Sequence, residues 1–435
     1  MKLNIRELRL EGVYEQRQTE AFMLRVKVPG GVLSAEQALK VCEIAERFAG
    51  GGIHLTSRAS IEFHWLKGEY LAEVMRMLAA VGLTTRGACG GAVRGIVCST
   101  PFAAEFPTVQ VLARKLHHHF TLNPHFEDLP KKFKIGVEAG YDGSRHLIQD
   151  AGLVYAGNDG DGALYDVWGA GGLGREPQPA FLLEERVPEA RIIPLLEGII
   201  RIYRRHTPAG KRLKHLLREI GREEFIRRLG EEVDRDATLP LIDGCDKCLT
   251  PVVEKGRPQR LEVHVFAGEL EAGRLRDLCG IAAQFAGGFM VLTCDQNVAF
   301  LLDERADIGK AEAALVEKGL NGAELGALVN FRVCPGSHEC RMGLGPTRDI
   351  SRAIIKALGP QGESLTWAIS GCPNSCSQPQ LAQVGIIIVK IVAEPGGERT
   401  PRFDLYRREG EEAFASAVHQ GITLDELLQA VAKIG

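Results

Sequence analysis

Apolar and polar residues alternate in a stretch that occurs twice along the chain. The first copy begins LRVKVPGG at Leu24, the second begins LEVHVFAG at Leu261, and they align without a gap over 42 positions. In each copy an alternating strand leads through a glycine turn into an amphipathic helix, and a second alternating strand follows. The pattern predicts two related strand–helix–strand units, with helices against one face of a sheet.

The two copies lie in opposite halves of the chain, which is too long a period for a solenoid and predicts a pseudo-two-fold molecule instead. Several residues are identical between them. The identical pairs include Gly31/Gly268, Cys42/Cys279, Ile44/Ile281, Phe48/Phe285, Gly50/Gly287, Thr56/Thr293 and Phe63/Phe300. We interpret Cys42 and Cys279 as helix core residues.

Composition narrows the class of protein. The 435 residues are 45% hydrophobic and 25% charged, as in ordinary globular proteins of several domains. A net charge of −3 gives no general attraction to nucleic acid or membrane. Without a signal peptide or a long apolar run, we expect a cytoplasmic protein with neither of those partners. Its eleven cysteines are therefore candidate metal ligands or reactive thiols rather than disulfides.

Four cysteines form two closely spaced pairs. Cys334 and Cys340 stand in VCPGSHEC, and Cys372 and Cys376 stand in SGCPNSC, further along the chain. Four thiolates suit either tetrahedral zinc or a cubane iron–sulfur cluster, and these spacings are not those of zinc knuckles. Glycine and proline in both loops argue against four thiols that merely pack. The pattern favours a [4Fe–4S] cluster.

These loops, together with GVYEQRQ…FMLRVKVPGG, LTSRASIEFH, LPKKFK and WGAGGLG, resemble the sulfite/nitrite reductase hemoprotein family. The resemblance covers nearly the whole chain from about Gly12. It implies siroheme and a [4Fe–4S] cluster as cofactors, with the four cysteines as cluster ligands. Cys376 would also be the bridging ligand of the siroheme iron.

The same resemblance implies the fold class and its domains. We expect an α+β, pseudo-two-fold molecule built from two ferredoxin-like half-domains and two siroheme- or cluster-binding α/β domains. The half-domains are expected at 1–70 and 255–320. The siroheme and anion-binding domain is expected at 80–240, and the domain carrying the cluster and the siroheme ligand at 325–435.

Three basic residues are candidates for the catalytic anion site. Arg58 lies in LTSRASIEFH, and Lys132 and Lys134 lie in LPKKFK, at positions that match the family. Reducing a small oxyanion requires positive groups that attract it and donate protons. Residues two apart in a strand share a face, so the two lysines can converge. The alternative is solvated strand lysines and a surface arginine. The repeat counterpart of Arg58 is Asp295, which places the anion pocket in the first half only.

Other residues are candidates for siroheme binding. Arg94 resembles a family position near the siroheme carboxylates, and the loop residues Gly171, Gly172, Gly174 and Arg175 resemble the family's siroheme loop. The basic stretch 201–228, with ten Lys and Arg against three Glu, is either a solvated helix face or an anion-binding segment.

The sequence departs from the family just before the Lys-x-Lys motif. Many members carry an active-site arginine there, whereas this chain has RKLHHHFTLNPHFEDLP. Either Arg114 or one of His117, His118, His119 and His125 takes that role, or the histidines are ordinary surface residues.

Cys245 and Cys248 form a further pair, in the connector between the halves. They are a redox dithiol, half of a metal site shared with a partner, or plain loop thiols.

The leading hypothesis is a siroheme-dependent six-electron reductase of sulfite to sulfide, and the alternative substrate is nitrite, reduced to ammonia. Lys134 favours sulfite, because nitrite enzymes often have Asn there, whereas GCPNSCSQPQLAQVGI is more typical of nitrite reductases. No flavin or nicotinamide segment is apparent. We therefore expect an external electron donor such as ferredoxin or a flavoprotein subunit. A precorrin-3B synthase-like oxygenase of cobalamin biosynthesis and a non-enzymatic electron-transfer subunit are the other hypotheses.

Overall fold

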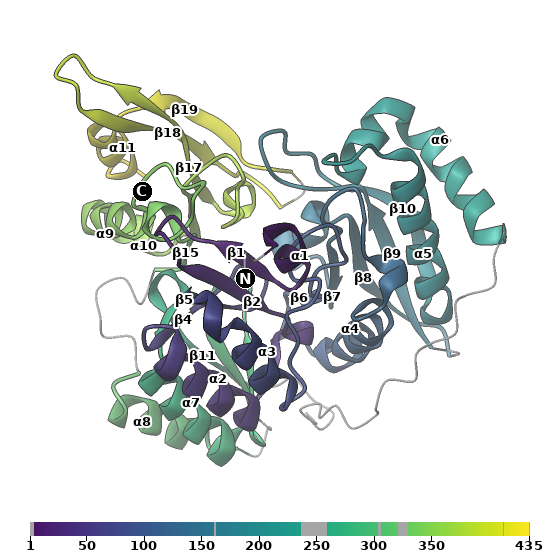
Figure 1. Cartoon of the computed structure of the whole chain (residues 1–435), viewed down its shortest axis with the longest axis horizontal. Coiled ribbons are helices and arrows are strands. Elements are labelled where there is room, and N and C mark those ends of the chain that lie inside the picture. The colour runs from purple at the N-terminus through teal and green to yellow at the C-terminus, as the bar shows by residue number, and fades with distance from the viewer. Residues whose placement is uncertain are drawn as a thin grey trace.

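The computed structural model describes residues 4–160, 162–235, 259–302, 306–320, 329–411 and 413–434. Within them the strands form four sheets with helices packed against them, which confirms the α+β fold class (Figure 1). The two larger sheet domains lie on either side of the first half-domain's sheet, whose strands β1 and β2 are central in the view. Each described helix is too short or too polar to cross a bilayer.

The two repeat units form two sheets that exchange strands. The first has the order β1-β2-β5-β4-β12 and the second has the order β11-β14-β13-β3. The strands of the first repeat are β1 (Val13–Glu15), β2 (Phe22–Val26), β3 (Val32–Ser34), β4 (Gly52–Leu55) and β5 (Ile61–Leu66). Those of the second are β11 (Gln259–Val263), β12 (Glu269–Glu271), β13 (Phe289–Leu292) and β14 (Val298–Leu302). Each repeat thus gives one short strand, β3 or β12, to the other's sheet.

The helices of the two repeats meet in a common core. They are α1 (Ile5–Leu10), α2 (Ala35–Phe48), α3 (Leu71–Ala79), α7 (Ala272–Phe285) and α8 (Ile308–Glu317). Helix α2 packs on α7, its pseudo-symmetry mate, and begins at a capping box formed by Ser34 and Gln37. Cys42 and Cys279 are both buried in this core, as are residues of α3. The core of the first half-domain therefore continues past position 70 into α3.

The strand exchange depends on two glycines related by the repeat. Gly31 has a φ of +79°, and a Cβ there would lie 2.5 Å from the carbonyl oxygen of Leu292. Gly268 has a φ of +70°, and a Cβ there would overlap the carbonyl oxygen of Leu55. Each glycine thus lets its own repeat approach the backbone of the other. This contact explains why glycine occupies both positions.

Gly31→Ala is expected to destabilise the protein more than Gly51→Ala does. Both glycines have a positive φ, but nothing lies within 4 Å of a Cβ on Gly51. The strained φ costs about 1 kcal/mol at either site, and the contact with Leu292 adds roughly 1–3 kcal/mol at Gly31 only. Thermal unfolding of both variants measures the difference, and equal destabilisation would refute the close approach.

The two larger domains repeat one another as well. Their sheets have the orders β10-β9-β8-β7-β6 and β15-β16-β17-β18-β19, and each sheet joins three parallel strands to an antiparallel pair. The first comprises β6 (Val97–Cys98), β7 (Ile135–Glu138), β8 (Ala151–Asn158), β9 (Ala163–Gly169) and β10 (Phe181–Pro188), with α4 (Phe106–Phe120), α5 (Glu189–His206) and α6 (Leu213–Arg235). The second comprises β15 (Phe331–Val333), β16 (Trp367–Ser370), β17 (Val384–Ala393), β18 (Arg399–Arg407) and β19 (Ser416–Ile422), with α9 (Thr347–Ala357), α10 (Pro360–Glu363) and α11 (Leu424–Val431). The pseudo-two-fold relation therefore extends to all four sheets.

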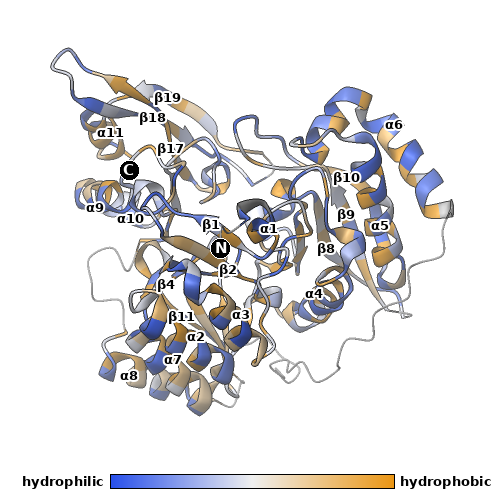
Figure 2. Cartoon of the chain, viewed as in Figure 1, coloured by the Kyte–Doolittle hydropathy of each residue, from blue (hydrophilic) through white to orange (hydrophobic). Residues whose placement is uncertain are grey.

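The basic stretch 201–228 runs through the end of α5 and most of α6, which is largely hydrophilic (Figure 2). Arg227 and Arg228 form exposed ion pairs with Glu224, so this end of the stretch is a solvated face. Arg212 and Lys214, by contrast, are buried. Cys245 and Cys248 lie outside the described residues.

Each of the two sheets that exchange strands has one face in the common core and a second face turned away from it. The second faces of the two sheets differ in polarity. In the second repeat, Val291, Ala299 and Leu301 make part of that face apolar and join the core of the first larger domain. The equivalent positions in the first repeat, by the same gapless alignment, are His54, Glu62 and His64. One sheet face is thus closed by packing, and the other leaves a polar surface around which a site can form.

Candidate active site

A cavity of about 740 Å³ opens over this polar sheet face. It lies among the first half-domain, the loop before β7, and the loops that follow β15 and β16. Its lining brings together residues that the sequence analysis took from distant motifs. These are Arg58, Arg94, Lys132, Lys134, Cys334, Cys340, Cys372 and Cys376.

The four cysteines converge because of the sheet topology. Strands β15 and β16 are parallel neighbours, so their carboxyl ends lie side by side. Cys334 directly follows β15, and Cys372 lies two residues after β16. The backbone N–H of Gly371 donates to Sγ of Cys334 at 3.1 Å, which ties the two loops together. Two cysteine pairs from separate segments of the chain thus face one cavity.

The chemistry of the cysteine set fits a metal cluster. All four side chains are free thiols, and none is fully buried. Burial, with the nearby Cys376 sulfur adding to it, raises the pKa of Cys372 to about 11, and the same causes raise the pKa of Cys334 further. Thiolates that line one cavity repel one another unless cations hold them. Iron in a cubane cluster supplies those cations.

The Cys376 loop is fixed to the loop that carries Arg58. Ser57 Oγ donates to the carbonyl oxygen of Cys376 at 2.6 Å, and Gln378 Nε2 donates to the carbonyl oxygen of Ser57 at 2.7 Å. These reciprocal bonds join the first half-domain to the cluster domain. They hold the Arg58 loop beside the cysteine whose sulfur faces the cavity.

More basic than acidic side chains line the cavity, so its positive charge is only partly balanced by the protein. Burial lowers the pKa of Arg58 to about 10 and that of Lys132 to about 8, with Arg94 adding to both effects. Burial, and then repulsion from Arg58 and Lys132, lowers the pKa of Lys134 well below its usual range. Half-buried cations crowded in this way favour an anionic ligand. A polycarboxylate tetrapyrrole together with a small oxyanion satisfies that preference.

The two lysines face the cavity for the reason predicted, although β7 begins one residue after Lys134. Phe133 between them is fully buried and bridges to Val93, so the extended backbone turns Lys132 and Lys134 to the opposite side. The backbone N–H of Lys134 donates to Oδ2 of Asp150 at 2.8 Å. Arg58 donates to Oε1 of Gln149 and to the carbonyl oxygen of Gly95, each at 3.0 Å.

Many polar residues of the cavity wall were missed by the sequence analysis, and five of them lie on or directly beside one sheet of the first half-domain. They are Arg25, Lys27, His54, Glu62 and His64. They alternate with the apolar residues that predicted the strands, so they cover the other face of the same sheet. The available signal was at His54, Glu62 and His64, where the repeat counterparts are apolar.

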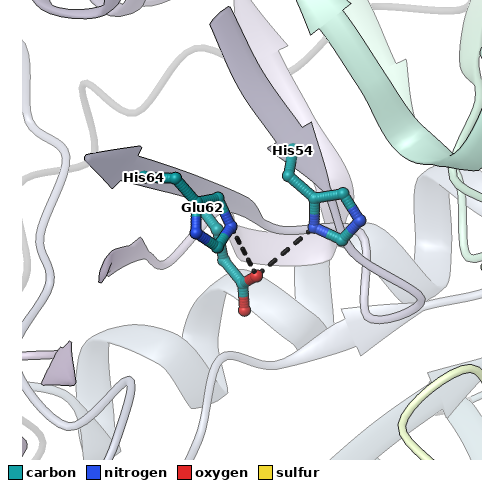
Figure 3. A group of neighbouring side chains, drawn as sticks. All are labelled: His54, Glu62 and His64. Atoms are coloured by element: carbon teal, nitrogen blue, oxygen red, sulfur yellow. Dashed lines mark hydrogen bonds and ion pairs between the residues drawn. The ribbon is translucent and has the colours of Figure 1, made fainter. Parts of the chain in front are cut away.

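Glu62 organises part of this wall (Figure 3). Its Oε2 lies 3.3 Å from Nδ1 of His54 and 3.5 Å from Nε2 of His64, while Arg25 pairs with Oε1. Arg25 and the histidines hold the pKa of the Glu62 carboxyl well below its usual range, although burial opposes the shift. His54, Glu62 and His64 are close enough to share a metal ion, but Arg25 already balances the carboxylate. His64 lines the cavity, and neither of its buried ring nitrogens has a hydrogen-bond partner of good geometry in the protein.

The glycine-rich loop meets the cavity through Leu173. A Cβ on Gly171 would overlap the carbonyl oxygen of Leu147, and one on Gly172 would overlap the Arg212 guanidinium. These glycines therefore make room for the protein's own packing, and Gly174 and Arg175 also lie outside the cavity lining. Their predicted role with siroheme stays a prediction.

The candidates for the missing arginine lie elsewhere. Neither Arg114 nor any of His117, His118, His119 and His125 is part of the cavity lining. His119 is buried and pairs with Glu197 at 2.7 Å. Arg25 and Lys27, on the sheet face, supply further positive charge to the cavity instead.

Fold and site define a redox enzyme that joins an iron–sulfur cluster to an anionic tetrapyrrole. The nitrite/sulfite reductase ferredoxin-like half-domain model matches residues 14–81 and 260–318, and the nitrite and sulphite reductase 4Fe-4S domain model matches residues 90–236. The cysteine loops at 334–376 lie beyond these ranges. The chain belongs to the sulfite/nitrite reductase hemoprotein family, whose members are oxidoreductases with siroheme and a [4Fe–4S] cluster.

Relatives span both substrates of the family. The chain is 26% identical over 397 residues to a ferredoxin sulfite reductase of Mycobacterium tuberculosis, covering 85% of this chain and 70% of the relative. It is 28% identical over 467 aligned positions to a ferredoxin–nitrite reductase of Leptolyngbya laminosa, covering 97% of this chain and 87% of the relative. It also resembles the solved structure of the Mycobacterium tuberculosis NirA protein, with a TM-score of 0.84 and 24% identity, over 100% of this chain and 87% of that one. The last match supports the shared fold.

Proposed function

We propose that this chain reduces sulfite to sulfide at the cavity, with electrons from an external donor. The supporting observation is that Arg58, Lys132 and Lys134 line the same cavity as Cys376. When bound there, siroheme supplies the iron that takes up the anion, and the cluster supplies the electrons. Cys334, Cys340, Cys372 and Cys376 are the proposed cluster ligands, and Cys376 the proposed bridge to the siroheme iron.

The basic residues would divide the remaining work. Arg58 is held by hydrogen bonds to Gln149 and Gly95, so it is suited to fixing an anion's orientation. The pKa of Lys132 is lowered to about 8 and that of Lys134 is also lowered, so both release a proton more readily than ordinary lysines. Arg94 and His64 also line the cavity and are the proposed partners of the tetrapyrrole's carboxylates.

Nitrite is the second candidate substrate, because the GCPNSC loop is typical of nitrite reductases and one relative carries that name. Retention of Arg58, Lys132 and Lys134 argues against the precorrin-3B synthase-like hypothesis. The names of the relatives specify either ferredoxin or NADPH, so the proposed donor is a ferredoxin or a flavoprotein subunit.

Lys134→Asn is expected to lower the specificity for sulfite relative to nitrite by about tenfold, the scale of one hydrogen bond to a charged group. The substitution removes the ammonium but leaves an amide donor, as many nitrite enzymes of the family have. Turnover of both anions, normalised to siroheme, measures the effect. An unchanged ratio would contradict the role of Lys134 in substrate choice.

A further inference from the structure

Lys27 occupies an unusual position in the cavity wall. It lies one residue after β2, is only 2% exposed, and lines the cavity. Its Nζ donates to the carbonyl oxygen of Val93 at 3.1 Å and to Oγ1 of Thr121 at 3.2 Å. An ammonium has three N–H donors, so one remains for a ligand in the cavity.

The contact with Thr121 continues away from the cavity. Thr121 directly follows α4, and its Oγ1 lies 3.4 Å from Nδ1 of His117, one turn earlier. His117 keeps 8% of its surface exposed, and its ring lies 5.8 Å from that of the more exposed His118. Lys27, Thr121 and His117 thus form a continuous chain of polar contacts.

We propose that Lys27, Thr121 and His117 form a proton-delivery chain from the surface at α4 to the anion in the cavity. The proposal rests on the proposed function, because reduction of sulfite or nitrite consumes protons at every loss of oxygen as water. This proton-delivery chain gives a role to His117, which belongs to the histidine run 117–119 of α4. None of the three histidines lines the cavity.

The transfer is balanced in protons and moves no electrons. Lys27 gives one N–H proton to an oxygen of the bound anion, and its Nζ lone pair then takes the hydroxyl proton of Thr121. The Thr121 oxygen takes the proton on Nδ1 of His117. The His117 ring takes up a proton from solvent at Nε2, and proton exchange returns it to the Nδ1–H tautomer before the next passage. Each passage carries one proton inward.

The surrounding charges suit this role. Lys27 faces Arg94, Glu127 and Cys89, and burial followed by the Arg94 charge lowers its pKa to about 7. Lys27 therefore loses and regains a proton readily near neutral pH. His117 faces Lys27, His118 and Arg114. Burial and these cations hold the pKa of His117 well below its usual value, so the ring is neutral at pH 7 and has a nitrogen free to accept a proton.

Thr121→Val tests the chain, because it removes the hydroxyl and keeps the side-chain shape. Turnover of sulfite and nitrite per siroheme is expected to fall about tenfold or more, with a larger solvent deuterium isotope effect. Thr121→Ser is expected to restore both quantities. The dissociation constant for sulfite, measured from the siroheme optical spectrum, should stay unchanged in both variants. Thr108→Val, on the same helix and outside the cavity, is the matched control.

His117→Ala gives a second test. Its turnover is expected to fall similarly and to recover when imidazole is added, because the small base can enter the vacated space and carry protons. The proton-delivery chain would be refuted if the Thr121→Val enzyme kept wild-type turnover and isotope effect. It would also be refuted if turnover fell only in proportion to the siroheme lost. Neither result would affect the proposed function, which fails instead if the wild-type protein reduces neither anion.

Discussion

Replacing Cys334, Cys340 or Cys372 by Ser, one at a time, is expected to abolish the [4Fe–4S] cluster and with it all electron transfer to the anion. The three thiols face one cavity from two loops tied together by the Gly371–Cys334 hydrogen bond. A cubane cluster that lacks one thiolate is unstable, and a serine hydroxyl is a poor substitute for a soft sulfur ligand.

Iron and acid-labile sulfide, measured on each purified variant, check this result. Cys42→Ala is the matched control, since Cys42 is a buried free thiol in the α2–α7 core, and its variant should keep full cluster content. Full iron and sulfide in all three Ser variants would disprove the ligand assignment.

Lys134→Met is expected to lower sulfite turnover by about 10²-fold or more, the scale of losing a positioned proton donor. Methionine keeps the length and apolar volume of the stem but removes the charge and all three donors. Siroheme and cluster content should survive, because Lys134 is proposed to bind the anion and not the siroheme, and its backbone bond to Asp150 does not involve its side chain. Turnover measured per siroheme separates loss of chemistry from loss of cofactor.

Lys131→Met is the control for that variant, because Lys131 lies in the same segment but is exposed and outside the cavity lining. If Lys134→Met lowers turnover only in proportion to lost siroheme, or not at all, Lys134 is an ordinary strand lysine and the anion pocket is wrongly assigned.

The repeat made much of the fold predictable. Alternation around Leu24 and Leu261 predicted the strands and the helix between them, and the common spacing predicted the pseudo-two-fold relation. The exchange of β3 and β12 was not predicted, because these strands are very short and pair only across the repeats. Its only trace in the sequence was glycine at positions 31 and 268, whose need for close approach is visible only in three dimensions.

The site was predictable where one motif supplied both chemistry and spacing. The cysteine pairs and the Lys132/Lys134 pair therefore converge as expected on one cavity. Glu62 and Lys27 were missed because alternation was used only to find the apolar face of the sheet. A charged residue on the other face of a strand is usually solvated, and only the surrounding domains show that here it is buried.

The most direct test of the proposed function is a comparison of sulfite and nitrite as substrates. The anaerobically purified, siroheme-replete protein is supplied with reduced methyl viologen, and kcat/KM is measured for each anion from the sulfide or ammonia formed. We expect six-electron reduction of sulfite to sulfide with the higher kcat/KM. A higher value for nitrite, or no sulfide from sulfite, would contradict it.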